Sequence, residues 1–155
     1  MLGPGRISVG IGKEQRGSQM DEQVSHKGLF IESLDRCTDS NEFVSAFYER
    51  FVSSSEEVKR KFRNTDFKQQ NQMLVRSLRL VAAATSGEQE GLQELRERAE
   101  THDRNHLAIK PELYELWREC VIDTACEYDP QWNDEVEDAW QNILTFSIDY
   151  MTRRF

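Results

Sequence analysis

The chain has 155 residues, of which 37% are hydrophobic and 31% are charged, so its length suits one globular domain. Its formal net charge of −8 argues against nucleic acid and against an anionic membrane surface as partners. No apolar run approaches membrane-spanning length, no secretory signal is visible, and three cysteines without a C-x-x-C spacing predict neither a disulfide framework nor a zinc site. We therefore expect a cytoplasmic protein.

The beginning of the chain differs from the rest in composition. Residues 1–25 are rich in glycine and show no hydrophobic period, which predicts a disordered N-terminal extension. Residues 26–155 are expected to form the folded domain. No alternating pattern in them predicts a strand, so we expect an all-α protein.

Helical hydrophobic periods divide the domain into segments of uneven length. A first helix is expected over 27–37, and a second should start at Asp39 or Ser40 as N-cap. An irregular corner is expected over 58–62. The later helices are expected over 65–85, 92–106, 111–128 and 133–154, with Phe67, Leu74, Leu78 and Val81 facing inward from the first of these. Such uneven segments do not suit an up-down bundle.

Two histidines, His102 and His106, close the apolar stripe of the 92–106 segment, just before Pro111. A neutral imidazole that points into an apolar pocket is what a haem iron needs as its axial ligand. The ordinary alternative is a pair of half-buried histidines at a helix end that need only hydrogen-bond partners. The residues around them decide between these interpretations.

Four local patterns occur in order along the chain. Tyr48 lies on a predicted buried face, and Phe62 follows it by 14 residues. Gln70 precedes Leu74 by four residues, so the two side chains share one face of a helix. The fourth pattern runs from His102 and His106 through Pro111 to Tyr114. In order and spacing, these patterns over residues 27–155 resemble the bacterial haem globins, including those of sensor type with a distal tyrosine and glutamine.

The resemblance implies a globin fold in which about seven helices pack around haem b (iron protoporphyrin IX). It implies that His102 binds the iron, that Tyr48 and Gln70 donate hydrogen bonds to a bound gas, and that Leu74 forms the steric wall over the iron. Further contacts to the cofactor are implied for Phe62, Arg98, His106 and Tyr114, with Arg98 and His106 near the haem propionates.

The choice between the two histidines rests on spacing. The interval from His102 to Tyr114 is two residues longer than in the globins used for comparison, and the interval from His106 is two residues shorter. His102 is preferred because Leu95 and Ala99 precede it on the same face, as helix F usually provides. Arg98, however, stands where an apolar haem contact is expected.

The resemblance predicts reversible binding of oxygen, with carbon monoxide and nitric oxide as alternative ligands, in an oxygen carrier or a gas sensor. Two alternatives stay open. One is a nitric oxide dioxygenase, which would need a separate reductase, so enzymatic activity is left undecided. The other is a haem-free globin-fold signalling module. A homodimer through the last two helices is a further expectation from sensor-type globins.

Overall fold

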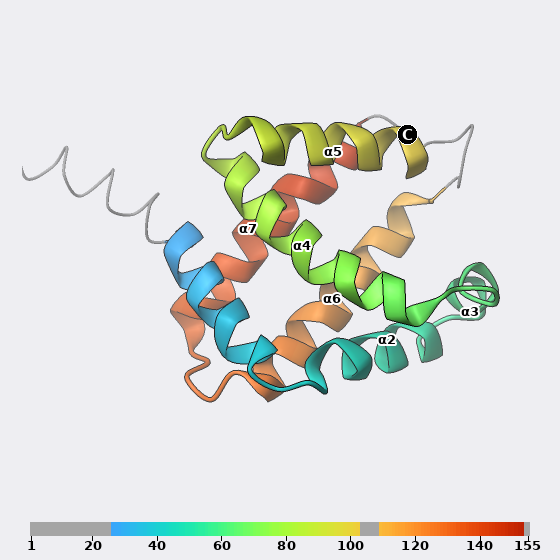
Figure 1. Ribbon diagram of the computed structural model, residues 1–155, viewed down its shortest axis with the longest axis horizontal. Helices are drawn as coiled ribbons and strands as arrows, with labels where there is room; N and C mark the ends of the chain where they lie inside the picture. The colour runs from blue at the N-terminus through green and yellow to red at the C-terminus, as the bar shows by residue number, and fades with distance from the viewer. Residues whose placement is uncertain (1–25, 103–108, 154–155) are drawn as a thin grey trace, which may run out of the picture.

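The computed structural model describes residues 26–102 and 109–153. In these ranges the protein is built from seven helices and contains no strand (Figure 1). An N-terminal helix over 26–38 is followed by α2 (Phe43–Ser53), α3 (Glu56–Lys61), α4 (Phe67–Thr85), α5 (Gln89–His102), α6 (Pro111–Tyr128) and α7 (Asp134–Thr152). The predicted all-α class is confirmed.

The helices cross one another rather than running side by side as in a parallel bundle (Figure 1). Helix α4 packs against α5 and α7, α2 packs against α6, and α7 also contacts α5 and α6. The core between them contains fully buried large side chains from the N-terminal helix, α2, α4, α5 and α7: Phe30, Leu34, Phe43, Phe47, Leu78, Leu95, Trp140 and Leu144. Steep crossings of this kind leave space between α2, α4, α5, α6 and α7, where the candidate site lies.

The predicted start of the second helix is wrong by two or three residues, because the observed N-cap is Glu42 and not Ser40 or Asp39. The N-terminal helix continues to residue 38, and the amide of Asp39 still donates to the carbonyl of Asp35 at 3.2 Å. Helix α2 therefore begins at Phe43, after a turn in which Ser40 Oγ accepts a hydrogen bond from the Glu42 amide. Ser40 thus shapes the turn and does not cap the helix.

The predicted irregular corner at 58–62 is also corrected, because most of it belongs to the short helix α3. The Ser55 hydroxyl accepts hydrogen bonds from the amides of Glu57 and Val58, which satisfies two donors at the helix start. Two acidic residues in the first turn and three basic residues in the last turn interact favourably with the helix dipole. Val58 is thereby placed in the wall of the site.

Two glycines set the junction between α4 and α5. Gly87 has a φ of 80°, and its amide donates to Ala84 while the Glu88 amide donates to Ala83, which is a Schellman motif. A Cβ on Gly91 would lie 2.3 Å from the Leu80 carbonyl oxygen, so only glycine allows this approach of the two helices. The close packing presents one face of α5 to the interior.

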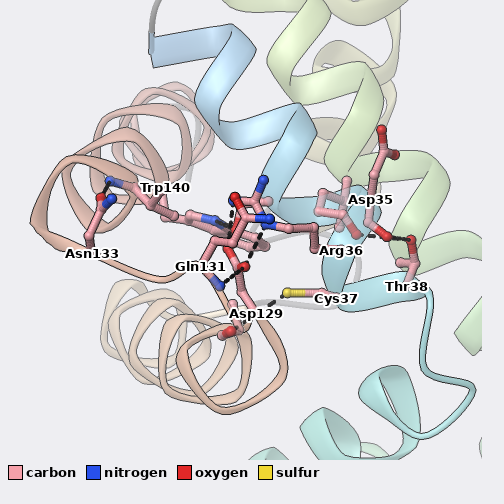
Figure 2. A network of polar contacts seen from close by, with 12 residues as sticks. Asp35, Arg36, Cys37, Thr38, Asp129, Gln131, Asn133 and Trp140 are labelled. Atoms are coloured by element: carbon pink, nitrogen blue, oxygen red, sulfur yellow. Dashed lines mark hydrogen bonds and ion pairs between the residues drawn. The ribbon is translucent and has the colours of Figure 1, made fainter.

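A buried carboxylate attaches the N-terminal helix to the corner between α6 and α7 (Figure 2). Asp129 Oδ2 accepts from Ser33 Oγ at 2.6 Å, and Asp129 Oδ1 accepts from Arg36 Nε at 2.6 Å. Trp140 Nε1 donates to Ser33 Oγ at 2.9 Å, and the Gln131 amide donates to Asp129 Oδ1 at 2.8 Å. The network joins the N-terminal helix to the α6–α7 corner and to Trp140 of α7, which follow it by 93 to 107 residues.

Candidate functional site

A cavity of about 710 Å³ lies between α2, α4, α5, α6 and α7. Its volume is typical of sites for cofactor-sized molecules. Every predicted site residue that the structure describes lines it: Tyr48, Phe62, Gln70, Leu74, Arg98, His102 and Tyr114. The remaining one, His106, lies outside the described residues.

Tyr48 and Gln70 meet on one side of the cavity. Tyr48 is 5% exposed, and its hydroxyl donates to the backbone carbonyl of Gln70 at 3.4 Å. Burial raises the pKa of Tyr48 to about 12, although the Gln70 hydrogen bond and the charge of Arg98 oppose this shift. The hydroxyl is therefore protonated at neutral pH and available as a donor. Leu74, one turn after Gln70, is 6% exposed and extends the same wall.

An aromatic cluster covers this side of the cavity. The rings of Tyr48 and Phe62 have centroids 5.9 Å apart, and Phe62 stacks on Phe67 at 6.1 Å. Phe67 was expected to face inward, but 39% of it is exposed. Because Phe67 is the first residue of α4, its ring packs on the other two at the surface while part of it faces solvent.

His102 is the last residue of α5 and lines the cavity from that helix. Its Nδ1 atom is buried and has no hydrogen-bond partner among the described residues. Burial lowers the pKa of His102 to about 4, and the charge of Arg98 acts in the same direction. The imidazole is therefore neutral at pH 7. Its ring centroid lies 6.3 Å from that of Tyr114, which belongs to the wall contributed by α6.

Arg98 takes part in an ion pair that the sequence analysis did not predict. Its Nε donates to Glu94 Oε1 at 2.8 Å, and Ser77 Oγ of α4 donates to the same oxygen at 3.0 Å. Burial would raise the pKa of Glu94, but the hydrogen bonds from Arg98 and Ser77 bring it below its usual value, so the carboxylate is ionised. The spacing of four residues between Glu94 and Arg98 was the available signal.

The rest of the wall is largely apolar and was only partly anticipated. Trp117 of α6 and Met151 of α7 line the cavity, and the periodicity of a single helix does not show which of its buried positions face a cavity. Met73 and Ile148 also line the cavity and were not singled out. Together with Leu74 they surround its polar groups with hydrophobic side chains.

These residues fit a haem group. A haem needs a neutral axial donor, an apolar slot for the porphyrin, and polar groups for its carboxylates and its gas ligand. The cavity offers a neutral histidine with an unpartnered buried nitrogen, aromatic and aliphatic walls, and the half-buried guanidinium of Arg98.

No described helix is long and apolar enough to cross a membrane.

Fold and cavity together define an all-helical protein of the globin type. The family model Globin matches residues 45–151, and the chain belongs to the globin family. It is also similar to the crystal structure of a protein from Pseudomonas aeruginosa that is described as structurally highly homologous to a human haemoglobin. The similarity has 28% sequence identity and a TM-score of 0.80, and covers 84% of this chain and 98% of that one. No curated protein matches the chain. Family membership implies a haem cofactor and gas ligands such as O2.

Proposed function

We propose that the protein is a haem globin that reversibly binds oxygen, carbon monoxide and nitric oxide at haem b, in an oxygen carrier or gas-sensing role. The observation that carries this proposal is the neutral, buried imidazole of His102 in the wall of the cavity that Tyr48 also lines. A buried ring nitrogen without a hydrogen-bond partner, as Nδ1 of His102 is among the described residues, is costly in a folded protein, and a metal bound at that atom would offset the cost.

Haem, when bound, supplies an iron with one open position for a diatomic gas. His102 would provide the axial nitrogen, since its ring is already neutral and no proton has to leave it. Phe62 and Tyr114 would pack against the porphyrin, and Leu74 would limit the space for ligands. Arg98 is 30% exposed at its side chain and would reach a haem carboxylate.

Tyr48 would be the main hydrogen-bond donor to the gas. Its bond to the Gln70 carbonyl is 3.4 Å long, which is beyond the usual range for a hydroxyl donor. Such a bond is easily exchanged for a shorter one to a ligand in the cavity. Gln70 would then act in two ways: its carbonyl holds the hydroxyl of Tyr48 while no ligand is bound, and its side chain offers a second donor once Tyr48 donates to the ligand.

The test is a haem titration followed by absorption spectra of the ferric, ferrous and carbon monoxide forms. We expect a strong Soret band at one haem per chain, and we expect His102→Gly to lose normal iron coordination and to regain it with added imidazole. His106→Ala is the matched control and should keep the spectrum of the unmodified chain. Protein that stays colourless after haem addition would overturn the proposal and favour a haem-free module.

The opposite outcome for the two histidine variants would move the iron ligand to His106. In that case haem binding would stand while the assignment of His102 would fall. Rescue by imidazole is informative because a variant that had merely lost its fold would not respond to it.

A further inference from the structure

The cavity wall contains a charged pair that a slot for an apolar porphyrin does not require. Glu94 and Arg98 are one turn apart on α5, and both line the cavity together with His102, a further turn along the helix. The side chain of Glu94 is 6% exposed and that of Arg98 is 30% exposed. Removing a carboxylate from water is costly, so such a pair persists only when its geometry is well satisfied.

The structure satisfies this pair from two helices. Glu94 Oε1 accepts from Arg98 Nε at 2.8 Å and from Ser77 Oγ of α4 at 3.0 Å. Because Gly91 allows the backbones of α4 and α5 to approach closely, the hydroxyl of Ser77 reaches across to α5. The carboxylate is therefore held between the helices, and it in turn restricts where the guanidinium of Arg98 can lie.

Arg98 lines the cavity together with His102 and Tyr48, the groups that would surround a gas-binding centre. Its charge opposes the burial effect that raises the pKa of Tyr48, so it acts across the cavity. Arg98 is one turn from His102 on α5, whereas Glu94 is two turns away and is bound by Ser77 of α4, so the positive end of the pair lies nearer to His102 along the helix. The pair thus has a defined polarity relative to His102.

We propose that Glu94 and Arg98 form a positioning pair that holds a permanent positive charge beside His102 and thereby favours the ferrous over the ferric state of the bound haem. The inference rests on the proposed function. Its physical basis is Coulombic: oxidation adds one positive charge at the iron, and a fixed cation nearby makes that addition less favourable in a cavity of low dielectric constant. Glu94 has the opposite sign and acts through its hold on Arg98 as well as through its own charge. Since a carrier binds oxygen in the ferrous state, the pair would support that role.

The test is a one-electron redox titration of the haem-loaded protein, with mediators as electron donors and acceptors and the absorption spectrum as readout. Arg98→Gln is expected to lower the midpoint potential. Glu94→Gln removes a negative charge but keeps an amide oxygen that can accept from Arg98 and Ser77, so Arg98 stays in place and the potential is expected to rise. A shift of the equilibrium by about tenfold corresponds to about 59 mV for one electron. Arg96→Gln is the matched control, since Arg96 is exposed on the same helix and the substitution removes the same charge.

Opposite signs for the two variants, with a smaller shift for Arg96→Gln, would support the positioning pair. Shifts of equal sign, or an Arg98→Gln shift no larger than that of the control, would overturn it. If Arg98→Gln fails to bind haem, Arg98→Lys is measured in its place. Because Arg98→Lys keeps the charge, its midpoint potential should stay near that of the unmodified protein, and a large drop would overturn the positioning pair. If the unmodified chain takes up no haem, the proposed function itself falls and this inference with it, whereas normal uptake with unmoved potentials removes only the inference.

Discussion

Asp129→Asn changes the shape of the side chain very little, yet the structure predicts that it causes a large loss of stability. Asp129 is 3% exposed and joins the N-terminal helix to the corner between α6 and α7 (Figure 2). Each of its carboxylate oxygens accepts two hydrogen bonds. Oδ1 accepts from Arg36 Nε and the Gln131 amide, and Oδ2 accepts from Ser33 Oγ and Arg36 Nη2.

The magnitude follows from this count. An asparagine replaces one oxygen by an NH₂ group, so in either orientation of the amide a hydrogen bond from Arg36 is lost and a donor is placed against the guanidinium, which also loses its buried counter-charge. Hydrogen bonds to charged groups contribute about 1.5–3 kcal/mol each, and breaking a buried ion pair costs about 3–5 kcal/mol. We therefore expect the free energy of unfolding to fall by about 3–5 kcal/mol, a large part of the ~5–15 kcal/mol of a typical domain.

The assay is urea unfolding followed by circular dichroism, with all proteins at the same haem loading. The matched control is Asp35→Asn, the same chemical change in a carboxylate whose partner, Arg79, is 2.7 Å away on the surface. The side chains of Asp35 and Arg79 are 57% and 42% exposed, so this control should cost under about 1 kcal/mol. The reasoning is refuted if Asp129→Asn lowers the unfolding free energy no more than Asp35→Asn does.

Three further predictions follow from the same geometry. Gly91→Ala should lower the free energy of unfolding in urea by about 1–3 kcal/mol, because its Cβ would meet the Leu80 carbonyl oxygen. Gly28→Ala is the control and should be neutral or stabilising, because a Cβ at Gly28 has no atom within 4 Å. Equal losses of stability for the two variants would contradict the close approach of the helices. Tyr48→Phe should speed oxygen dissociation by about 10–100-fold in stopped-flow measurements, and an unchanged rate would reduce Tyr48 to packing. Burial would raise the pKa of Asp129, but hydrogen bonds from Arg36, Ser33 and Gln131 leave it below 3.8, so its stabilising contribution is present above that pH and is lost as the pH falls through the folded value. The stability gap between the unmodified protein and Asp129→Asn should therefore narrow in acid, and a constant gap down to complete protonation would count against this network.

Local signals were sufficient to predict most helices, and the resemblance to bacterial haem globins implied many of the residues that line the cavity. The helix over 111–128 was predicted with its observed bounds, because Pro111 suits the first turn and Pro130 follows soon after its end. The order of Tyr48, Phe62 and His102 placed each of them where the cavity now lies. Their roles toward haem remain predictions.

Local signals failed where two segments compete or where a distant partner decides. Ser40 resembled an N-cap, but the preceding helix extends to residue 38, and the amides of Asp39 and Ser40 donate to carbonyls of that helix. Phe67 had the period of an inward residue, yet the position of α4 at the rim leaves it partly in solvent. Periodicity describes one helix at a time, so it cannot say how deeply a neighbouring helix covers a face.

The sequence by itself determined the helical class, the hydrophobic faces and the chemical types available to the site, since these depend on residues within a few turns of one another. Only the tertiary structure decided that Glu94 is buried and held by Ser77, that Gln70 meets Tyr48 through its carbonyl, and that Asp129 binds Arg36 across 93 residues. The physical reason is the same in all three cases. The cost of burying a polar group, and the partner that offsets it, depend on which elements pack together in space and not on their spacing along the chain.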